Sequence, residues 1–159
     1  MKDVRNVEKK EVARLYERYS RDVYRLALSY LHSSQDAEDI CQSVFLKLLE
    51  TNITLLAQKE KAWLLKCTAN ACKNHLTAFW NRNREALNEN IVFHDQSDRE
   101  LWDTVGRLPP KYRAAVHLYY YEGYSQEEIA GILGITQTAV QTRMQRARSI
   151  LKKELSVNE

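Results

Sequence analysis

The residues with the clearest chemical potential are amides, hydroxyls and cations gathered between Thr136 and Lys153, a stretch without any acidic residue. Short polar side chains at the start of a helix reach base edges in the DNA major groove, and arginines beside them hold phosphates. We therefore expect this stretch to bind duplex DNA. The candidate contacts are Thr136, Gln137, Thr138, Gln141, Thr142, Arg143, Gln145, Arg146 and Arg148.

Two helices separated by a tight turn are expected to carry these side chains. Ser125 and Glu128 have the spacing of a capping box, which marks the start of the first helix. Gly134 lies where the chain must turn sharply, and Thr136 is placed to cap the second helix. The buried stripe of the second helix is predicted to comprise Val140, Met144, Ala147 and Leu151. The pattern favours a helix-turn-helix over an ordinary helical hairpin with a basic, solvated face.

A second group of amides and lysines recurs at helical spacing in the middle of the chain. A helix is predicted to begin near Ala62, after a loop at residues 51–61. Its buried side is expected to comprise Trp63, Leu65, Ala69, Cys72, Leu76 and Phe79. Its polar side comprises Lys66, Asn70, Lys73, Asn74 and Thr77. Such a face suits base edges and phosphates, but it is also common on helices that are merely solvated.

Two further amphipathic helices are predicted upstream, at about 8–31 and 36–50. Ser33 and Ser34 are the candidate caps of the second one. Leu46 falls outside the apolar stripe of that helix. Its polar neighbours there are Gln42, Ser43 and Lys47. This side of the helix is either solvated or a partner-binding surface, and the pattern alone does not decide between the two.

The chain has 159 residues, of which 44% are hydrophobic, so it can bury the core of one ordinary domain or of two small ones. Only four Gly and two Pro occur, and no alternating β-branched run is flanked by hairpin turns. An all-α protein is therefore predicted. The apolar periodicity fails at residues 81–97, which we interpret as a flexible linker between domains at 8–80 and 98–155.

The second domain is expected to begin with a helix that Ser97 caps and Pro109 ends. The next helix, at about 111–122, is predicted to end at Gly123, because glycine adopts the left-handed C-terminal conformation most easily. Its three consecutive tyrosines are interpreted as core and interface packing rather than as a platform for nucleic-acid bases. They are Tyr119, Tyr120 and Tyr121.

Several classes of function are disfavoured by the composition. The net charge of +3 does not by itself indicate a nucleic-acid partner, so the local distribution of charge carries that argument. The start lacks a secretory signal and no window approaches a membrane span, which predicts a cytoplasmic protein without membrane insertion. The three cysteines are expected to be free thiols. The sequence predicts neither an enzyme nor a cofactor or zinc site, because no catalytic set or metal-ligand spacing occurs.

Three stretches together resemble one family over nearly the whole chain. They are residues 36–50 (DAEDICQSVFLKLLE), residues 62–76 (AWLLKCTANACKNHL) and residues 108–155, which include the predicted helix-turn-helix. In this order they are similar to the three strongest blocks of the extracytoplasmic-function (ECF) sigma factors of bacterial RNA polymerase. The resemblance implies two helical domains, a linker that threads along the polymerase, and promoter-specific initiation of transcription without covalent chemistry.

The resemblance also implies the partners of each block. The helix matching 36–50 would bind bacterial core RNA polymerase through Asp39, Gln42, Ser43, Leu46 and Lys47. The block near 62–76 would recognise the minus-ten promoter element and capture a base flipped from the melted strand. Its candidate residues are Lys61, Lys66, Asn70, Lys73 and Asn74. The helix-turn-helix residues named first would read the minus-thirty-five promoter DNA, and an anti-sigma factor is expected as a controlling partner by analogy alone.

Two other functions remain open from the sequence. A free-standing transcriptional regulator would use only the helix-turn-helix and would bind a palindrome with half-sites about 34 Å apart. Its amino-terminal half would serve for dimerisation. A protein-binding adaptor built from two helical modules would show no salt-dependent affinity for DNA. Start-site selection by core polymerase distinguishes the sigma factor from both.

Overall fold

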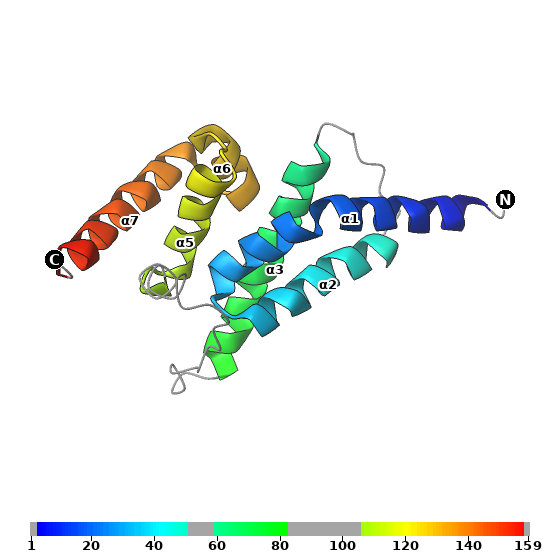
Figure 1. Cartoon of the computed structure of the whole chain (residues 1–159), viewed down its shortest axis with the longest axis horizontal. Helices are drawn as coiled ribbons and strands as arrows, with labels where there is room; N and C mark the ends of the chain where they lie inside the picture. The colour runs from blue at the N-terminus through cyan, green and yellow to red at the C-terminus, as the bar shows by residue number, and fades with distance from the viewer. Residues whose placement is uncertain (1–2, 51–58, 83–105, 158–159) are drawn as a thin grey trace.

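The computed structural model describes residues 3–50, 59–82 and 106–157, and every regular element within them is a helix (Figure 1). The first half contains α1 (Asp3–Leu31), α2 (Ser34–Glu50) and α3 (Glu60–Arg82). The second half contains α5 (Pro110–Val116), the π-helical turn η1 (His117–Tyr121), α6 (Gln126–Leu133) and α7 (Gln137–Val157). The predicted all-α class, with two helical domains and a helix-turn-helix in the second, is confirmed.

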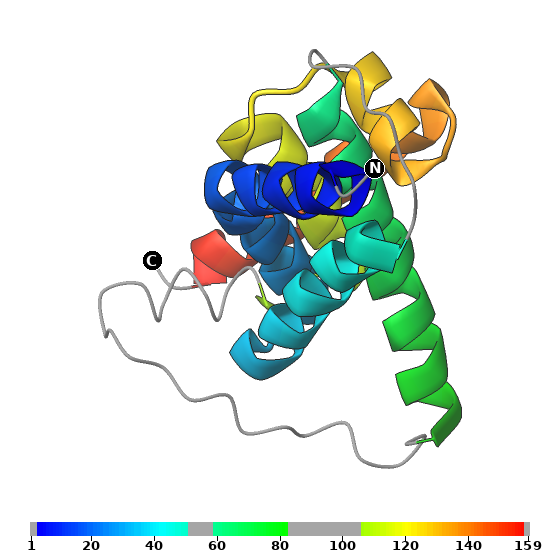
Figure 2. The same ribbon diagram turned by 90° about the vertical axis from the view of Figure 1, so that its right-hand side faces the viewer.

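The three helices of the first half share one core, and Figure 2, which looks along α1, shows α2 and α3 beside it. Leu15, Val23, Leu26 and Tyr30 form the buried apolar stripe of α1, in agreement with the amphipathic helix predicted at about 8–31. The chain leaves α1 through His32, whose φ of 51° is left-handed. Asp36 N donates to Ser33 Oγ at 3.3 Å, so Ser33 is the residue that caps α2.

The start of α3 differs from the prediction, because the helix begins at Glu60 rather than near residue 62. Glu60 is only 4% exposed and its carboxylate accepts a hydrogen bond from Arg14 Nη2 at 2.6 Å, which anchors the first turn to α1. Lys61 is therefore a helical residue and not part of the predicted loop. Thr68 is also buried, although it is polar, because its hydroxyl donates to Leu64 O at 2.7 Å. The side chain of Phe79 and residues 51–58 lie outside the described part.

The helix predicted at 111–122 is interrupted by a π-helical turn. α5 continues into η1, where Glu122 N donates to His117 O at 3.1 Å. A π turn holds extra backbone and rotates the following side chains relative to an α-helix. Leu118 is fully buried, while Tyr120 and Tyr121 are 61% and 56% exposed. The core part of the interpretation is therefore wrong for these two tyrosines, whereas the interface part fits Tyr121, whose hydroxyl accepts a hydrogen bond from Arg25 of α1. Gly123 has a φ of 76°, as expected for the end of the helix.

The two halves pack against each other, with α5 against α1 and α6 against α3 (Figure 1). Buried side chains from both halves belong to one continuous hydrophobic cluster. Gly106 lies so close to His32 that a Cβ at this position would clash with the imidazole ring. The predicted cap at Ser97 and most of the predicted helix before Pro109 lie outside the described residues, as do residues 83–97 of the predicted linker.

Candidate nucleic-acid interface

The turn between α6 and α7 has the geometry of a helix-turn-helix. Ser125 and Glu128 exchange two backbone-to-side-chain hydrogen bonds of 3.1 Å, so the predicted capping box is confirmed. Gly134 has a left-handed φ of 69°, which glycine adopts without strain. Thr136 Oγ1 then accepts a hydrogen bond from Ala139 N at 3.1 Å and caps α7. Both helices therefore begin where the sequence predicted.

α7 packs one stripe inward and presents its polar side chains outward. Val140, Met144 and Ala147 are fully buried, while Leu151 is half-buried. We call the nine predicted DNA contacts of this helix the α7 site. Its exposed members are Thr136, Gln137, Thr138, Gln141, Gln145, Arg146 and Arg148. Thr142 is half-buried, and its hydroxyl donates to Thr138 O at 3.0 Å.

Arg143 departs from the prediction that it faces outward. It is half-buried, and its Nη1 atom is buried without a hydrogen-bond partner. Its charge acts on Tyr30 of α1 and on Lys73 of α3, which places it on the side of α7 that faces the first half. The helical pattern of α7 carries no information on the neighbouring half, so it predicts Arg143 on the outward side.

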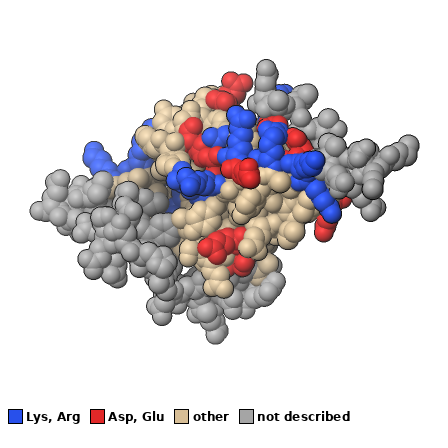
Figure 3. Space-filling model, turned by 45° about the vertical axis from the view of Figure 1, so that its right-hand side comes forward, with Lys and Arg blue, Asp and Glu red and all other residues tan. Residues whose placement is uncertain are grey.

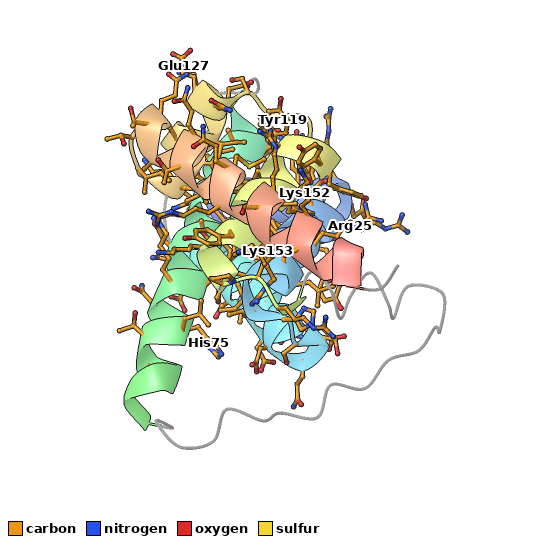
Figure 4. All side chains as sticks on the ribbon, turned by 90° about the vertical axis from the view of Figure 1, so that its left-hand side faces the viewer. Arg25, His75, Tyr119, Glu127, Lys152 and Lys153 are labelled. Atoms are coloured by element: carbon orange, nitrogen blue, oxygen red, sulfur yellow. The ribbon has the colours of Figure 1, made fainter. Side chains whose placement is uncertain are left out.

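Two cations of the α7 site are braced by tyrosines that the sequence analysis did not assign to it. Arg146 Nη1 lies 3.4 Å from the Tyr112 hydroxyl, and this hydrogen bond lowers the pKa of the phenol. Arg148 Nε donates to the Tyr120 hydroxyl at 3.0 Å. Figure 4 looks onto α7 from this outer side, with Lys152 and Lys153 on its last turns. The tyrosines hold the guanidinium groups in position, which lowers the entropy lost when a phosphate is bound.

The predicted minus-ten residues on α3, which we call the α3 site, divide into two groups. Lys66, Asn70 and Asn74 are exposed, whereas Lys61 and Lys73 are half-buried. Lys61 Nζ lies 2.7 Å from Glu122 Oε2, and Lys73 Nζ donates to Leu133 O. Burial lowers the pKa of Lys73, and the charge of Arg143 lowers it further. Both lysines are therefore held by groups of the second half.

The predicted polymerase-binding residues of α2, which we call the α2 site, are all exposed. They are Asp39, Gln42, Ser43, Leu46 and Lys47. Leu46 is 58% exposed, and beside it runs a groove of about 460 Å³ between α2 and α1. Exposed Tyr16 and Leu49 line this groove as well. Figure 3 shows Lys and Arg gathered in a band with Asp and Glu among them, above a mostly uncharged area that carries one acidic cluster.

The groove adds α1 residues to a surface that sequence analysis had assigned to α2 alone. The groove is lined by Lys9, Val12, Ala13, Tyr16, Glu17, Gln42, Phe45, Leu46 and Leu49. Tyr16 lies just outside the apolar stripe of α1. An aromatic residue in that position is the one feature of the sequence that indicates a contribution of α1 to this surface. An apolar groove with a charged rim is the usual anatomy of a protein-binding surface.

The histidines and cysteines offer no metal centre in the described residues, where no group of three or more His, Cys, Asp or Glu could hold an ion. Cys41, Cys67 and Cys72 are free, and burial raises the pKa of the Cys72 thiol to about 12. His75 Nε2 instead lies 3.5 Å from Asp36 Oδ2. No helix in these residues is long and apolar enough to cross a membrane.

The fold and its sites define a two-domain helical protein of the helix-turn-helix class. Residues 15–82 match the family model for sigma-70 region 2, and residues 98–151 match the model for sigma-70 region 4. Several relatives carry the ECF designation. The chain belongs to the ECF sigma factors, which direct promoter-specific transcription by RNA polymerase.

Two relatives illustrate the match. The ECF RNA polymerase sigma factor SigE of Mycolicibacterium smegmatis is 29% identical over 155 residues, which cover 89% of this chain and 60% of that protein. The chain thus spans less than two thirds of SigE. The RNA polymerase sigma factor SigZ of Bacillus subtilis is 30% identical over 131 residues, covering 74% of this chain and 72% of that one.

Solved structures of similar fold include two that were determined as complexes with another protein. The co-crystal structure of the sigma factor RpoE with the anti-sigma factor NepR from Bartonella quintana matches with a TM-score of 0.76 and 20% identity, covering 94% of this chain and 99% of that one. CnrH in complex with the cytosolic domain of CnrY matches with a TM-score of 0.67 and 22% identity, covering 98% and 94%. At these identities the likeness shows the fold alone.

Proposed function

We propose that this chain binds core RNA polymerase through the α2 site and reads promoter DNA at two places. The α7 site contacts the minus-thirty-five element as duplex DNA. The α3 site contacts the minus-ten element and holds a base that has left the stack of the melted strand. Recognition and strand capture require no covalent step from the protein.

The observation that carries the proposal is the α7 site itself. Seven of its nine side chains are exposed on a helix that has a defined cap at Thr136 and no acid up to Lys153. Amides at Gln141 and Gln145 suit base edges, while the braced guanidinium groups of Arg146 and Arg148 suit phosphates. The α7 site thus offers both the base contacts and the phosphate contacts that sequence-specific binding needs.

The α2 site supports the polymerase contact. Leu46 protrudes beside an apolar groove, while the α7 site lies on the other half of the molecule. An apolar groove of this kind suits a protein partner, which a chain that bound DNA as a monomer would not need. We also propose that an anti-sigma factor controls the chain, because the fold neighbour RpoE was solved with such a partner.

Transcription from a randomised promoter library tests the proposal. Purified chain and bacterial core polymerase are incubated with duplexes of random sequence, and the templates that give transcripts are sequenced together with their start sites. The expected result is two blocks of preferred bases at a fixed spacing upstream of one start site. A palindrome bound without polymerase would support the free-standing regulator instead, and the absence of salt-dependent DNA binding would support the adaptor.

Variants of the α2 site separate polymerase binding from DNA reading. Leu46→Asp places a charge in the apolar surface and is expected to weaken binding to core polymerase at least tenfold, without changing duplex binding by the isolated chain. Glu50→Gln, an exposed change at the end of the same helix, is the control and should leave polymerase binding unchanged. Equal polymerase affinity for Leu46→Asp and the wild type would contradict the assignment of the α2 site.

A further inference from the structure

The π-helical turn η1 places two neighbouring tyrosines beside α7. Tyr119 is half-buried and packs against the hydrophobic cluster, while Tyr120 is 61% exposed. Their rings meet edge to face, with centroids 4.9 Å apart, which is a favoured arrangement of aromatic rings. Figure 4 shows Tyr119 beside α7. Tyr119 therefore holds the exposed ring of Tyr120 in a defined position, in a kind of turn that is frequent at functional sites.

Arg148 of α7 completes this arrangement. Its Nε donates to the Tyr120 hydroxyl at 3.0 Å, and its guanidinium carbon lies 6.0 Å from the centroid of each of the two tyrosine rings. Within the described residues no carboxylate forms an ion pair with Arg148, in contrast to Lys61, which pairs with Glu122. The positive charge of Arg148 is therefore available to an anion from outside the chain.

The hydrogen bond between Arg148 and Tyr120 leaves donors on both side chains. The guanidinium uses the N–H of Nε for this bond and keeps the N–H groups of Nη1 and Nη2. The tyrosine hydroxyl accepts from Arg148, so its own hydrogen is left to donate. The described part of the chain provides no acceptor for that hydrogen. A group that accepts from both side chains and carries negative charge, such as a phosphodiester, is the ligand that fits them.

The pair lies on the side of α7 that also carries Gln141. An α-helix turns about 100° and rises about 1.5 Å per residue, so Gln141 and Arg148 are about 20° apart around the helix and about 10 Å apart along it. A recognition helix contacts base edges with its first turns, and phosphate contacts fix its position on the duplex. With Gln141 at a base edge, Arg148 and Tyr120 should come to the sugar-phosphate backbone that borders the groove.

Tyr112 provides an internal comparison on the other side of α7. It accepts a hydrogen bond from Arg146, which is about 200° around the helix from Arg148. Tyr112 is only 7% exposed, whereas Tyr120 is 61% exposed. A buried tyrosine positions its arginine but presents little surface to a ligand. Tyr120 both positions Arg148 and remains open to one.

We propose that Tyr120 is itself a DNA contact and forms, together with Arg148, a clamp for one phosphate of the duplex that α7 reads. This inference rests on the proposed function of the α7 site, and it adds a residue of η1 to that site. The guanidinium supplies the charge and its Nη donors, while the tyrosine hydroxyl donates a further hydrogen bond to the same phosphate. The clamp contributes affinity and orientation on any base sequence.

Removal of a single hydroxyl from the full chain gives the first test. Tyr120→Phe keeps the ring and should weaken binding to a short random-sequence duplex about fivefold, because one hydrogen bond to a phosphate is lost. Tyr121→Phe is the matched control, since it removes the neighbouring exposed hydroxyl, which accepts from Arg25. The control should change affinity less than twofold, and thermal unfolding should be the same for both variants. Equal affinities of the two variants would overturn the clamp.

A second test distinguishes direct contact from positioning of Arg148 alone. Arg148→Met removes a charge and should lower duplex affinity about eightfold at 0.1 M salt and flatten the salt dependence by about 0.9. The tyrosine hydroxyl is uncharged, so Tyr120→Phe should leave the salt dependence unchanged. Added to Arg148→Met, Tyr120→Phe should weaken binding at least a further twofold, because Tyr119 still holds the ring. A flattened salt dependence for Tyr120→Phe alone, or no further loss in the double variant, would overturn the direct contact.

The outcomes separate the clamp from the proposed function. A phosphate contact does not depend on base sequence, so the random duplex tests the clamp without knowledge of the promoter. Failure of start-site selection in the library experiment, with the effects of Tyr120→Phe intact, would remove the promoter role and leave the clamp. Normal start-site selection without an effect of Tyr120→Phe would overturn the clamp alone. Absence of duplex binding by the wild type would overturn the clamp as well.

Discussion

The α7 site and the α3 site carry the same kinds of side chain in different settings. On α7 the amides and two arginines are open to solvent, and tyrosines of the same half brace the guanidinium groups. On α3 the amides are also exposed, but two of the three lysines contact the other half. The comparison teaches that residue type indicates what a site binds, while the neighbouring domain decides whether it is available.

Replacement of Arg113 should weaken the contact between the two halves. Arg113→Met leaves the carbonyls of Ser29, Tyr30 and Leu108 without their donor, and we expect the free energy of unfolding to fall by about 4 kcal/mol. Urea unfolding followed by circular dichroism measures the loss. Arg21→Met, at an exposed position of α1, is the control and should change stability by less than about 0.5 kcal/mol. Similar values for both variants would mean that Arg113 does not hold the halves together.

Acid should weaken the contact between the halves through His117. Burial and then the charge of Arg25 lower the pKa of His117 to about 4, from an ordinary value of 6.5. Between pH 6.5 and about pH 4 the unfolded chain is protonated at His117, whereas the folded chain is not. The free energy of unfolding therefore falls as the pH falls, by about 3 kcal/mol in total.

The measurement for His117 is urea unfolding at pH 7 and at pH 4.5. Arg25, Asp22, Lys61 and Glu122 also act on or lie near this ring, so the wild type must be compared with His117→Gln. The variant should lose less stability on acidification, by about 2 to 3 kcal/mol. Parallel pH profiles for the two proteins would contradict a buried neutral histidine.

Base reading by the α7 site should depend on Gln141. A bidentate amide favours adenine, and a matched pair of this kind discriminates by about 2 kcal/mol. Gln141→Ala should therefore remove the preference at one position of the upstream block in the promoter library and leave the other positions unchanged. Loss of preference spread over the whole block would indicate that Gln141 acts on the fold of α7 instead.

Arg146 should contribute affinity without sequence preference. Arg146→Ala removes a phosphate contact, which is expected to lower duplex affinity about eightfold at 0.1 M salt and to flatten the salt dependence by about 0.9. All sequences should be affected alike. Arg21→Ala is the matched control, and an equal change in that variant would show that only net charge matters.

The smallest effect on DNA affinity is expected for replacement of Lys73, which we compare with replacement of Lys66 on the same helix. In the free chain Lys73 is engaged by Leu133 O, while Lys66 is exposed on the same helix. Lys66→Ala should reduce binding of a random-sequence DNA single strand severalfold, and Lys73→Ala by less than twofold. With core polymerase present the two variants should become equally impaired. A large effect of Lys73→Ala in the free chain would contradict the engagement of Lys73 by Leu133 O.

Local signals in the sequence were sufficient to predict much of the second half. The capping box at Ser125, the left-handed glycine at Gly134 and the cap at Thr136 depend on residues within one turn, and each is present in the structure. The apolar stripe of α7 was predictable for the same reason. The π turn at His117–Tyr121 was not, because no local pattern signals an extra residue per turn.

What the sequence did not show depends on contacts between distant residues. The burial of Arg113, the pairing of Lys61 with Glu122 and the inward side of Arg143 all require the two halves to be in place. The place of Tyr16 beside the groove likewise depends on the packing of α1 against α2. Periodicity reports one helix at a time, so such contacts stay hidden until the helices are assembled.

The central claim is that the α3 site and the α7 site contact promoter DNA together on the polymerase. Because Lys61 and Lys73 of the α3 site contact the second half in the free chain, we expect the halves to move apart in that complex. A double electron–electron resonance measurement tests it most directly, with spin labels at exposed Thr77 of α3 and Glu127 of α6 in a chain whose cysteines are replaced. The account predicts a short, narrow distance distribution for the free chain and a longer one with core polymerase and promoter DNA. The same distribution in both samples would contradict it.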